Sequence, residues 1–209
     1  MRSDVYQRMR DDIVSGALAA ETPLVEITLA AKYGTSRTPI REALRRLEQD
    51  GLVVRADRSM RVRARSPEEI LEIYEVRISL EGMAARGAAE RRTALDLAKL
   101  RRTAERMAEA DTDDPRAMAD ANRRFHEAVW AASHNATLLD LLTRLNDHLI
   151  RYPSTTLSHP GRWEEALREH AELVAAIERH DAAAATEVAE RHMTKARDVR
   201  LLMYGDEGP

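Results

Sequence analysis

The chain has 209 residues, of which 44% are hydrophobic, 33% charged and 4% aromatic. This length suffices for one or two domains with a sizeable buried core. Cysteine is absent, which excludes disulfide scaffolds, thiolate metal sites and cysteine nucleophiles. The sequence also has neither a long apolar run nor a signal-like N-terminus, so we expect a cytoplasmic protein without a membrane span.

The net charge of −3 is unevenly distributed along the chain. Residues 1–66 carry 13 Lys and Arg against 9 Asp and Glu, whereas residues 67–209 carry 20 against 27. A basic N-terminal region followed by an acidic region indicates a polyanionic partner that contacts only the N-terminal region. An ordinary arginine-rich surface would produce the same numbers, so charge by itself leaves nucleic-acid binding open.

The first third of the chain alternates apolar stripes with breaks. Gly16, Pro23 and Gly34 separate the first two helices from each other and from a third, whose N-cap we assign to Ser36. We expect Ile27 on the apolar face of the second helix. The predicted helices span 3–16, 26–33 and 37–49, and two short strands follow at 52–55 and 60–63, the only β signal in the chain.

Everything after residue 66 has the pattern of helices joined by short connections, which favours an antiparallel bundle. The predicted fold is therefore mainly α, with a small N-terminal domain at 1–65 and an all-helical domain at 66–209. The bundle helices are expected at 67–91, 93–111, 114–133, 136–152, 162–180 and 182–203.

The helices at 26–33 and 37–49 have the spacing of a helix-turn-helix, with the hairpin from Arg55 to Arg63 as a wing. In such a motif the first turns of the second helix face base edges in the major groove, and arginine can donate two hydrogen bonds to guanine. A plain helical hairpin with a solvated arginine face remains an alternative. The candidate DNA contacts are Ser36, Arg37, Thr38, Arg41 and Arg45 on the helix and Arg58 and Ser59 in the wing.

The stretch Gly34-Thr35-Ser36-Arg37-Thr38-Pro39-Ile40-Arg41-Glu42-Ala43-Leu44, with Asp50-Gly51-Leu52-Val53 after it, resembles the winged helix-turn-helix signature of GntR-family transcriptional regulators. This resemblance implies operator contacts from Arg37, Thr38, Arg41 and the wing tip. The chain departs from the family at that tip, where Arg58-Ser59-Met60 replaces the usual glycine.

Histidines on three predicted helices are the main chemical feature of the bundle. Asn122 and His126 are one helical turn apart, and His170 and His192 lie in the middle of two later helices. Three imidazoles and an amide oxygen could close on one divalent ion inside a bundle, although three unrelated surface histidines would have the same spacing. His134, His159 and His180 fall in connections, where we expect surface or cap roles.

Further motifs resemble the FCD effector domain, the usual partner of this wing domain: Arg77-x-x-x-Glu81, Asn122-x-x-Phe125-His126, Glu169-His170 and His192. The resemblance implies a metal, zinc or nickel, at the positions of Asn122, His126, His170 and His192. The first position is most often Asp in the family and is Asn here. The resemblance also implies a small carboxylate effector beside the metal, with Arg77 as its best second anchor and His148 and Arg151 as weaker ones.

These features together predict a dimeric, ligand-responsive transcriptional regulator that binds a palindromic DNA operator, with repression as the commoner mode in the family. The pair His126-Glu127 is not followed by the second histidine of a zincin motif, so we expect no enzyme activity. The alternatives are a metalloenzyme, which would show metal-dependent turnover without DNA, and a nucleic-acid binder without sequence preference.

Overall fold

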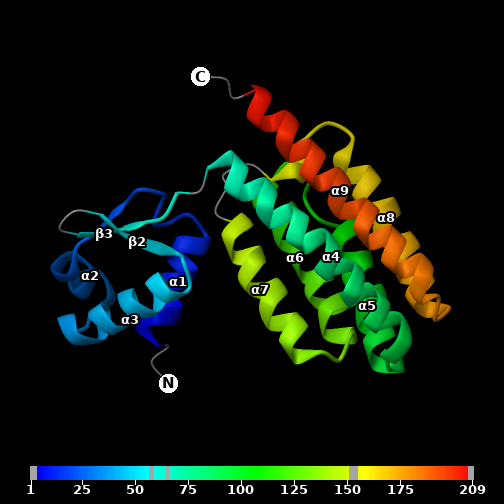
Figure 1. Cartoon of the computed structure of the whole chain (residues 1–209), viewed down its shortest axis with the longest axis horizontal. Coiled ribbons are helices and arrows are strands. Elements are labelled where there is room, and N and C mark those ends of the chain that lie inside the picture. Colours follow the sequence, from blue (N-terminus) through cyan, green and yellow to red (C-terminus); the bar gives the residue numbers. More distant parts are fainter. Residues whose placement is uncertain (1–3, 57–58, 65, 151–154, 207–209) are drawn as a thin grey trace. The chain divides into compact units, whose positions relative to one another are not determined.

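The computed structural model describes residues 4–56, 59–64, 66–150 and 155–206. The chain divides into two compact units, Met1–Ser66 with Asn146–Pro153, and Pro67–Leu145 with Ser154–Pro209. Helices dominate in each unit, and the strands found in the described ranges form one small sheet (Figure 1). The expected mainly α fold is thereby confirmed.

The first unit contains α1 (Val5–Val14), α2 (Glu26–Tyr33) and α3 (Arg37–Gln49). The side chain of Asp4 caps α1 by accepting a hydrogen bond from the amide of Tyr6 at 3.2 Å. Gly34 ends α2 in the left-handed conformation, with φ of 63°, which costs glycine little. The predicted apolar stripe of α3 is confirmed, because its members are all buried: Ile40, Ala43, Leu44 and Leu47.

Two local expectations in this unit were wrong. Ser36 occupies the N-cap position of α3, but its side chain makes no capping hydrogen bond. Ile27 is 66% exposed, whereas α2 buries Leu29 and Tyr33. Residues 29 and 33 are one turn apart and form a narrow stripe, and a residue two positions before such a stripe points to the opposite side of the helix.

The sheet has three strands in the order β1-β3-β2. The predicted hairpin forms from β2 (Val53–Ala56) and β3 (Ser59–Val62), paired antiparallel from Val53↔Val62 to Ala56↔Ser59. The additional strand β1 (Pro23–Leu24) pairs with β3, so the hairpin is not the only β structure of the chain. Two residues are too few to show a period, and proline is tolerated because β1 lies at the sheet edge.

The region after Ser66 is a bundle of helices whose bounds agree with the predicted ones within a few residues. Its described part contains six α-helices, as expected, and residues 146–150 at the end of one of them belong to the first unit. The segment predicted as a loop before the fifth of them holds one 3₁₀ turn, η1 (Thr156–Ser158). The helices are α4 (Pro67–Arg91), α5 (Ala94–Ala108), α6 (Pro115–Ala132), α7 (Ala136–Ile150), α8 (Arg162–Glu178) and α9 (Ala182–Asp206).

Small side chains bring α4 and α9 close together along much of their length (Figure 1). Ala84, Ala85 and Ala88 are fully buried on α4. A Cβ added to Gly82 would lie 2.7 Å from Oε1 of Glu190 on α9, so a larger residue here would require the Glu190 side chain to move. Within the described ranges, none of the helices is long and apolar enough to cross a bilayer.

Candidate functional site

The start of α3 presents the candidate DNA contacts to solvent. The side chains of Arg37 and Arg41 are 57% and 53% exposed, and Ser36, Thr38 and Arg45 are exposed as well. The Ser36 side chain leaves the N-terminus of α3 uncapped, so the first amides of this helix can donate hydrogen bonds to a phosphate. Ser59 is exposed in the wing, while Arg58 lies outside the described residues.

Glu26, at the first position of α2, contacts both of the leading arginines, a role that the sequence analysis did not assign. Its Oε2 accepts hydrogen bonds from Nε and Nη2 of Arg37 at 3.0 and 2.8 Å. Nε and Nη2 of Arg41 donate to Oε1 and Oε2 at 3.1 and 3.0 Å. The hydrogen bonds from Arg41 and then Arg37 lower the pKa of Glu26 to about 2, so this carboxylate is ionised at neutral pH.

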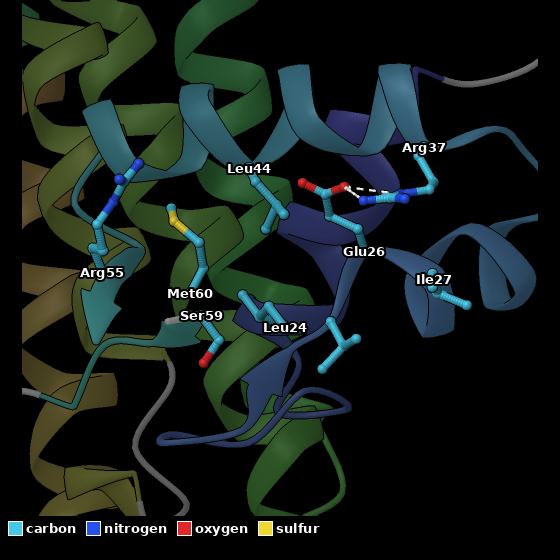
Figure 2. A pocket seen from close by; sticks show the side chains of 9 residues that line it. Leu24, Glu26, Ile27, Arg37, Leu44, Arg55, Ser59 and Met60 are labelled. Atoms are coloured by element: carbon cyan, nitrogen blue, oxygen red, sulfur yellow. Dashed lines mark hydrogen bonds and ion pairs between the residues drawn. The ribbon is translucent and has the colours of Figure 1, made fainter. Parts of the chain in front are cut away.

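A groove of about 730 Å³ runs between this helix pair and the β hairpin (Figure 2). Leu24, Leu44 and Met60 supply apolar walls, and Arg37 and Arg55 contribute guanidinium groups. Apolar walls flanked by cations suit a deoxyribose-phosphate strand, whose sugars are apolar and whose phosphates are anionic.

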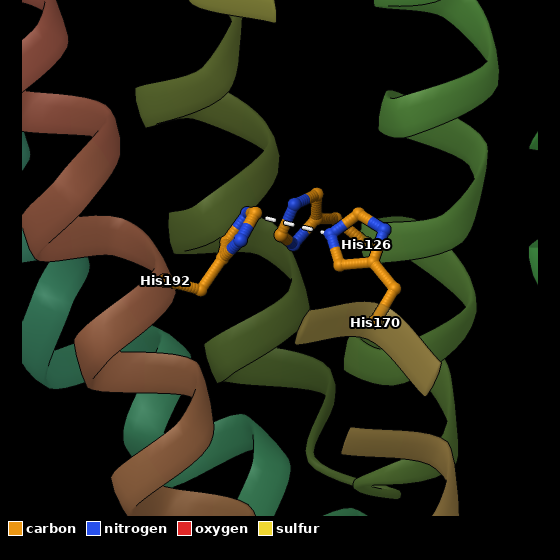
Figure 3. Close-up of side chains that lie close together, drawn as sticks. All are labelled: His126, His170 and His192. Carbon is orange, nitrogen blue, oxygen red and sulfur yellow. Dashed lines mark hydrogen bonds between the residues drawn. The ribbon is translucent and has the colours of Figure 1, made fainter. Parts of the chain in front are cut away.

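In the other unit, His126 of α6, His170 of α8 and His192 of α9 meet inside the bundle (Figure 3). One ring nitrogen from each lies within 4.8 Å of the others, and the Nε2 atoms of His170 and His192 are 3.4 Å apart. All three side chains are buried. The predicted convergence of three helices on one point is therefore what the structure contains, and three imidazoles at this spacing are a donor set for a divalent transition metal.

Burial favours the neutral form of His170 and His192, which is the form that metal binding requires. Desolvation lowers the pKa of His170 well below its usual value, and the neighbouring rings add to the effect. Desolvation also lowers the pKa of His192 to about 4, although its hydrogen bond with Glu169 opposes the shift. Phe125 stacks on the ring of His170 at a centroid distance of 4.0 Å and restricts its rotation.

Asn122 supplies independent evidence that the cluster fits a ligand. It lies on α6 one turn before His126, and its Oδ1 is buried without a hydrogen-bond partner among the described residues. A buried amide oxygen normally has a partner, and a metal ion is one that would satisfy it. The donor set of three imidazoles and one amide oxygen has no anionic member.

Two buried carboxylates orient the histidines from the side away from the cluster. Oε2 of Glu169 lies 2.6 Å from Nδ1 of His192, and the same oxygen accepts a hydrogen bond from Nη1 of Arg162 at 2.8 Å. Burial by itself raises the pKa of Glu169, but the hydrogen bond with His192 and the charge of Arg162 hold it at about 2. An anionic partner at Nδ1 directs Nε2 of His192 toward the other rings.

Glu81 of α4 does the same for His126. Its Oε2 is 3.4 Å from Nδ1 of His126 and accepts a 2.7 Å hydrogen bond from Nε1 of Trp130, while its Oε1 accepts one of 2.6 Å from Arg77. Burial raises the pKa of Glu81, but His126 and Arg77 outweigh it and lower the value to about 2. Glu81 and Glu169 belong to the motifs that resemble the FCD domain, but the sequence assigned them no role.

Of the three predicted effector anchors, Arg77, His148 and Arg151, the structure describes the first two. Arg77 is 5% exposed and connects to the histidine cluster through Glu81, and its Nε has no hydrogen-bond partner among the described residues. His148 is half-buried on α7, and Arg151 lies outside the described residues. Their roles as effector contacts stay predictions.

Comparison with known proteins shows the family to which the chain belongs. Residues 1–60 match the bacterial regulatory proteins of the gntR family, and residues 72–195 match the FCD domain. These matches define a helix-turn-helix transcriptional regulator, not an enzyme. The chain belongs to the GntR family and carries an FCD domain.

Its relatives include the HTH-type transcriptional regulator YdhC of Bacillus subtilis, 32% identical over 86% of this chain and 82% of that protein. A protein of Paenarthrobacter nicotinovorans named "Probable D-xylose utilization operon transcriptional repressor" is 33% identical over 92% of this chain and 85% of its own length. The solved structure of McbR/YncC from E. coli has the same fold, with a TM-score of 0.80, 24% identity and coverage of 97% and 98% of the two chains.

Proposed function

We propose that this regulator acts in the cytoplasm as a homodimer, binds a palindromic operator and represses transcription until a small carboxylate binds. The domains would be residues 1–65, which contact DNA, and residues 66–209, which bind the effector and the second subunit. The exposed Arg37 and Arg41 on the first turns of α3 support operator reading most directly. Two such helices in a symmetric dimer would read half-sites about one helical turn apart.

The histidine cluster supports the effector class. Asn122, His126, His170 and His192 would hold a divalent ion, zinc or nickel by resemblance to the family. When bound, the ion supplies a +2 charge that no ligand neutralises. Glu81 and Glu169 do not cancel this charge, because each is paired with its own arginine, Arg77 and Arg162. An anion such as a carboxylate is the complementary ligand.

DNA from just upstream of the protein's own gene is the first probe, used with excess non-specific competitor. We expect operator preference of roughly 10³-fold or more over unrelated DNA. Arg41→Ala should cost about 1–3 kcal/mol at one base pair and relax preference there. An equal loss on every sequence would make Arg41 a phosphate contact, and no specific binding at any salt concentration would contradict the proposed function.

Citrate-like and lactate-like acids added to the same assay test the effector class. Release of the operator by one of them supports regulation through the metal pocket. Specific binding that ignores every acid would keep the regulator and contradict the carboxylate effector. Metal-dependent turnover of an acid without DNA would favour the metalloenzyme instead.

A further inference from the structure

The contacts between Glu26 and the two leading arginines use one particular edge of each guanidinium group. Both Arg37 and Arg41 donate from Nε and Nη2, the side edge, to the same carboxylate. The opposite pair of donors, on Nη1 and the remaining hydrogen of Nη2, has no partner among the described residues. A guanidinium group has five N–H donors in a fixed plane, so fixing one edge also fixes the direction of the other.

The free edge is the one that an end-on contact with guanine requires. Guanine presents O6 and N7 in the major groove, and two parallel N–H donors of one arginine match them. Arg37 and Arg41 are one helical turn apart on α3, so both side chains extend from the same face of the helix. Glu26 therefore leaves the base-reading donors available while it restricts the rotation of both side chains.

The negative charge of Glu26 lowers the affinity of this surface for DNA of any sequence. Glu26 is ionised, and its side chain is 27% exposed next to a surface that would meet phosphates. Removing a negative charge from such a surface strengthens attraction to DNA of any sequence. A carboxylate at this place therefore improves DNA binding only if it increases the discrimination between sequences.

We propose that Glu26 is a specificity-determining positioning residue, which holds Arg37 and Arg41 side-on so that their free edges read two guanines of the operator. This inference rests on the proposed function, because it requires sequence-specific DNA binding. Glu26 itself contacts no base in this arrangement and acts through the arginines.

The test compares two affinities of the full-length protein. One probe is a duplex that the wild-type protein selects from a random-sequence pool, and the other is a scrambled duplex of the same composition. For Glu26→Gln we expect affinity for the scrambled duplex to stay equal or rise, and affinity for the selected duplex to fall about tenfold, the scale of one bidentate contact. The loss should concentrate at guanine positions and shrink when Arg41→Ala is already present.

Glu42→Gln is the matched control. Glu42 is an exposed residue of the same α3, and it has no hydrogen bond or ion pair among the described residues. Its replacement removes the same charge without touching the arginines, so the ratio of the two affinities should stay at the wild-type value.

Three outcomes would overturn the inference. A parallel rise of both affinities in Glu26→Gln would make Glu26 a mask over the arginines instead of a positioning residue. A parallel fall together with a lower melting temperature would make its role structural. If the wild-type protein selects no sequence from the pool, the proposed function itself fails, which the first selection reveals before any variant is measured.

Discussion

Carboxylates hold nitrogen-bearing side chains both on the surface of this protein and in its interior, and solvent exposure separates the two cases. On the proposed DNA-binding surface, Glu26 contacts two arginines that are more than half exposed. Inside the bundle, Glu169 is 4% exposed and contacts His192 and Arg162, which are buried with it. The chemistry is similar, but water competes with the first set and is excluded from the second.

This difference predicts different consequences of losing a partner. Exposed ion pairs contribute little to stability, about 0–1 kcal/mol, so Glu26 affects the direction of the arginines more than the fold. A buried pair is coupled to the fold, because removing one partner leaves a charge without compensation in a dry interior. The surface arrangement can therefore open to a new ligand, whereas the buried one holds its geometry.

Removing a histidine of the buried cluster should have the largest effect. His126→Ala deletes one of three imidazole donors, and we expect the affinity for zinc to fall by more than about a hundredfold, beyond the range typical of outer-shell partners. Metal analysis of the purified protein and zinc titration against a chelator measure this change. His134→Asn is the control, since His134 is exposed and bonds Asp96 away from the cluster. Equal metal content in His126→Ala and wild type would contradict the site.

Removing the orienting carboxylate should have a smaller effect on the same quantity. Glu169→Gln keeps the shape but loses the charge at Nδ1 of His192, and we expect zinc affinity to fall by about 10–100-fold. Glu165→Gln is the matched control, because Glu165 also bonds Arg162 but contacts none of the three histidines. The same zinc affinity in both variants would mean that the carboxylate supports only the fold.

The ion pair between Asp12 and Lys32 in the first unit should have the smallest effect, which is on the free energy of unfolding, and this effect should depend on pH. Asp12 accepts hydrogen bonds from Lys32 and Tyr33 at 2.7 Å each. Burial raises the pKa of Asp12, but these two partners outweigh it and lower the value below the unfolded one, near 3.9. The stabilisation is therefore present above the unfolded pKa and is lost as pH falls through the folded pKa.

Asp12→Asn should then reduce the free energy of unfolding at pH 7 by less than about 1 kcal/mol. The gap between variant and wild type should close at a strongly acidic pH, below the folded pKa of Asp12, where the wild-type carboxyl becomes protonated. Urea unfolding at both pH values, followed by NMR signals of α1 and α2, measures the gap. Asp11→Asn controls for charge at an exposed neighbour. A gap that does not change with pH would rule out the ion pair as its source.

Local pattern was sufficient for much of this protein. The apolar stripe of α3 and the one-turn spacing of Asn122 and His126 are both short-range features. Such features predict which residues form a helix and which of its faces is apolar, because helical geometry depends on neighbours within one or two turns. Motif resemblance added the family, and the family match confirmed it.

Contacts between elements could not be predicted from local pattern. The sequence placed Ile27 in the core, whereas the packing of α2 exposes it. Arg162, at the start of α8, is almost completely buried, because Glu169 and His192 bind its guanidinium group. The partners of Arg37, Arg41, His126 and His192 likewise come from positions that no periodicity connects to them.

The sequence by itself therefore determined the helices and the helix-turn-helix, and it supplied the candidate metal-binding side chains. Only the tertiary structure decided which carboxylate meets which arginine or imidazole, and whether water reaches the pair. The physical reason is that helix propensity and period are encoded locally, while an ion pair and its dielectric environment depend on where two elements meet in space.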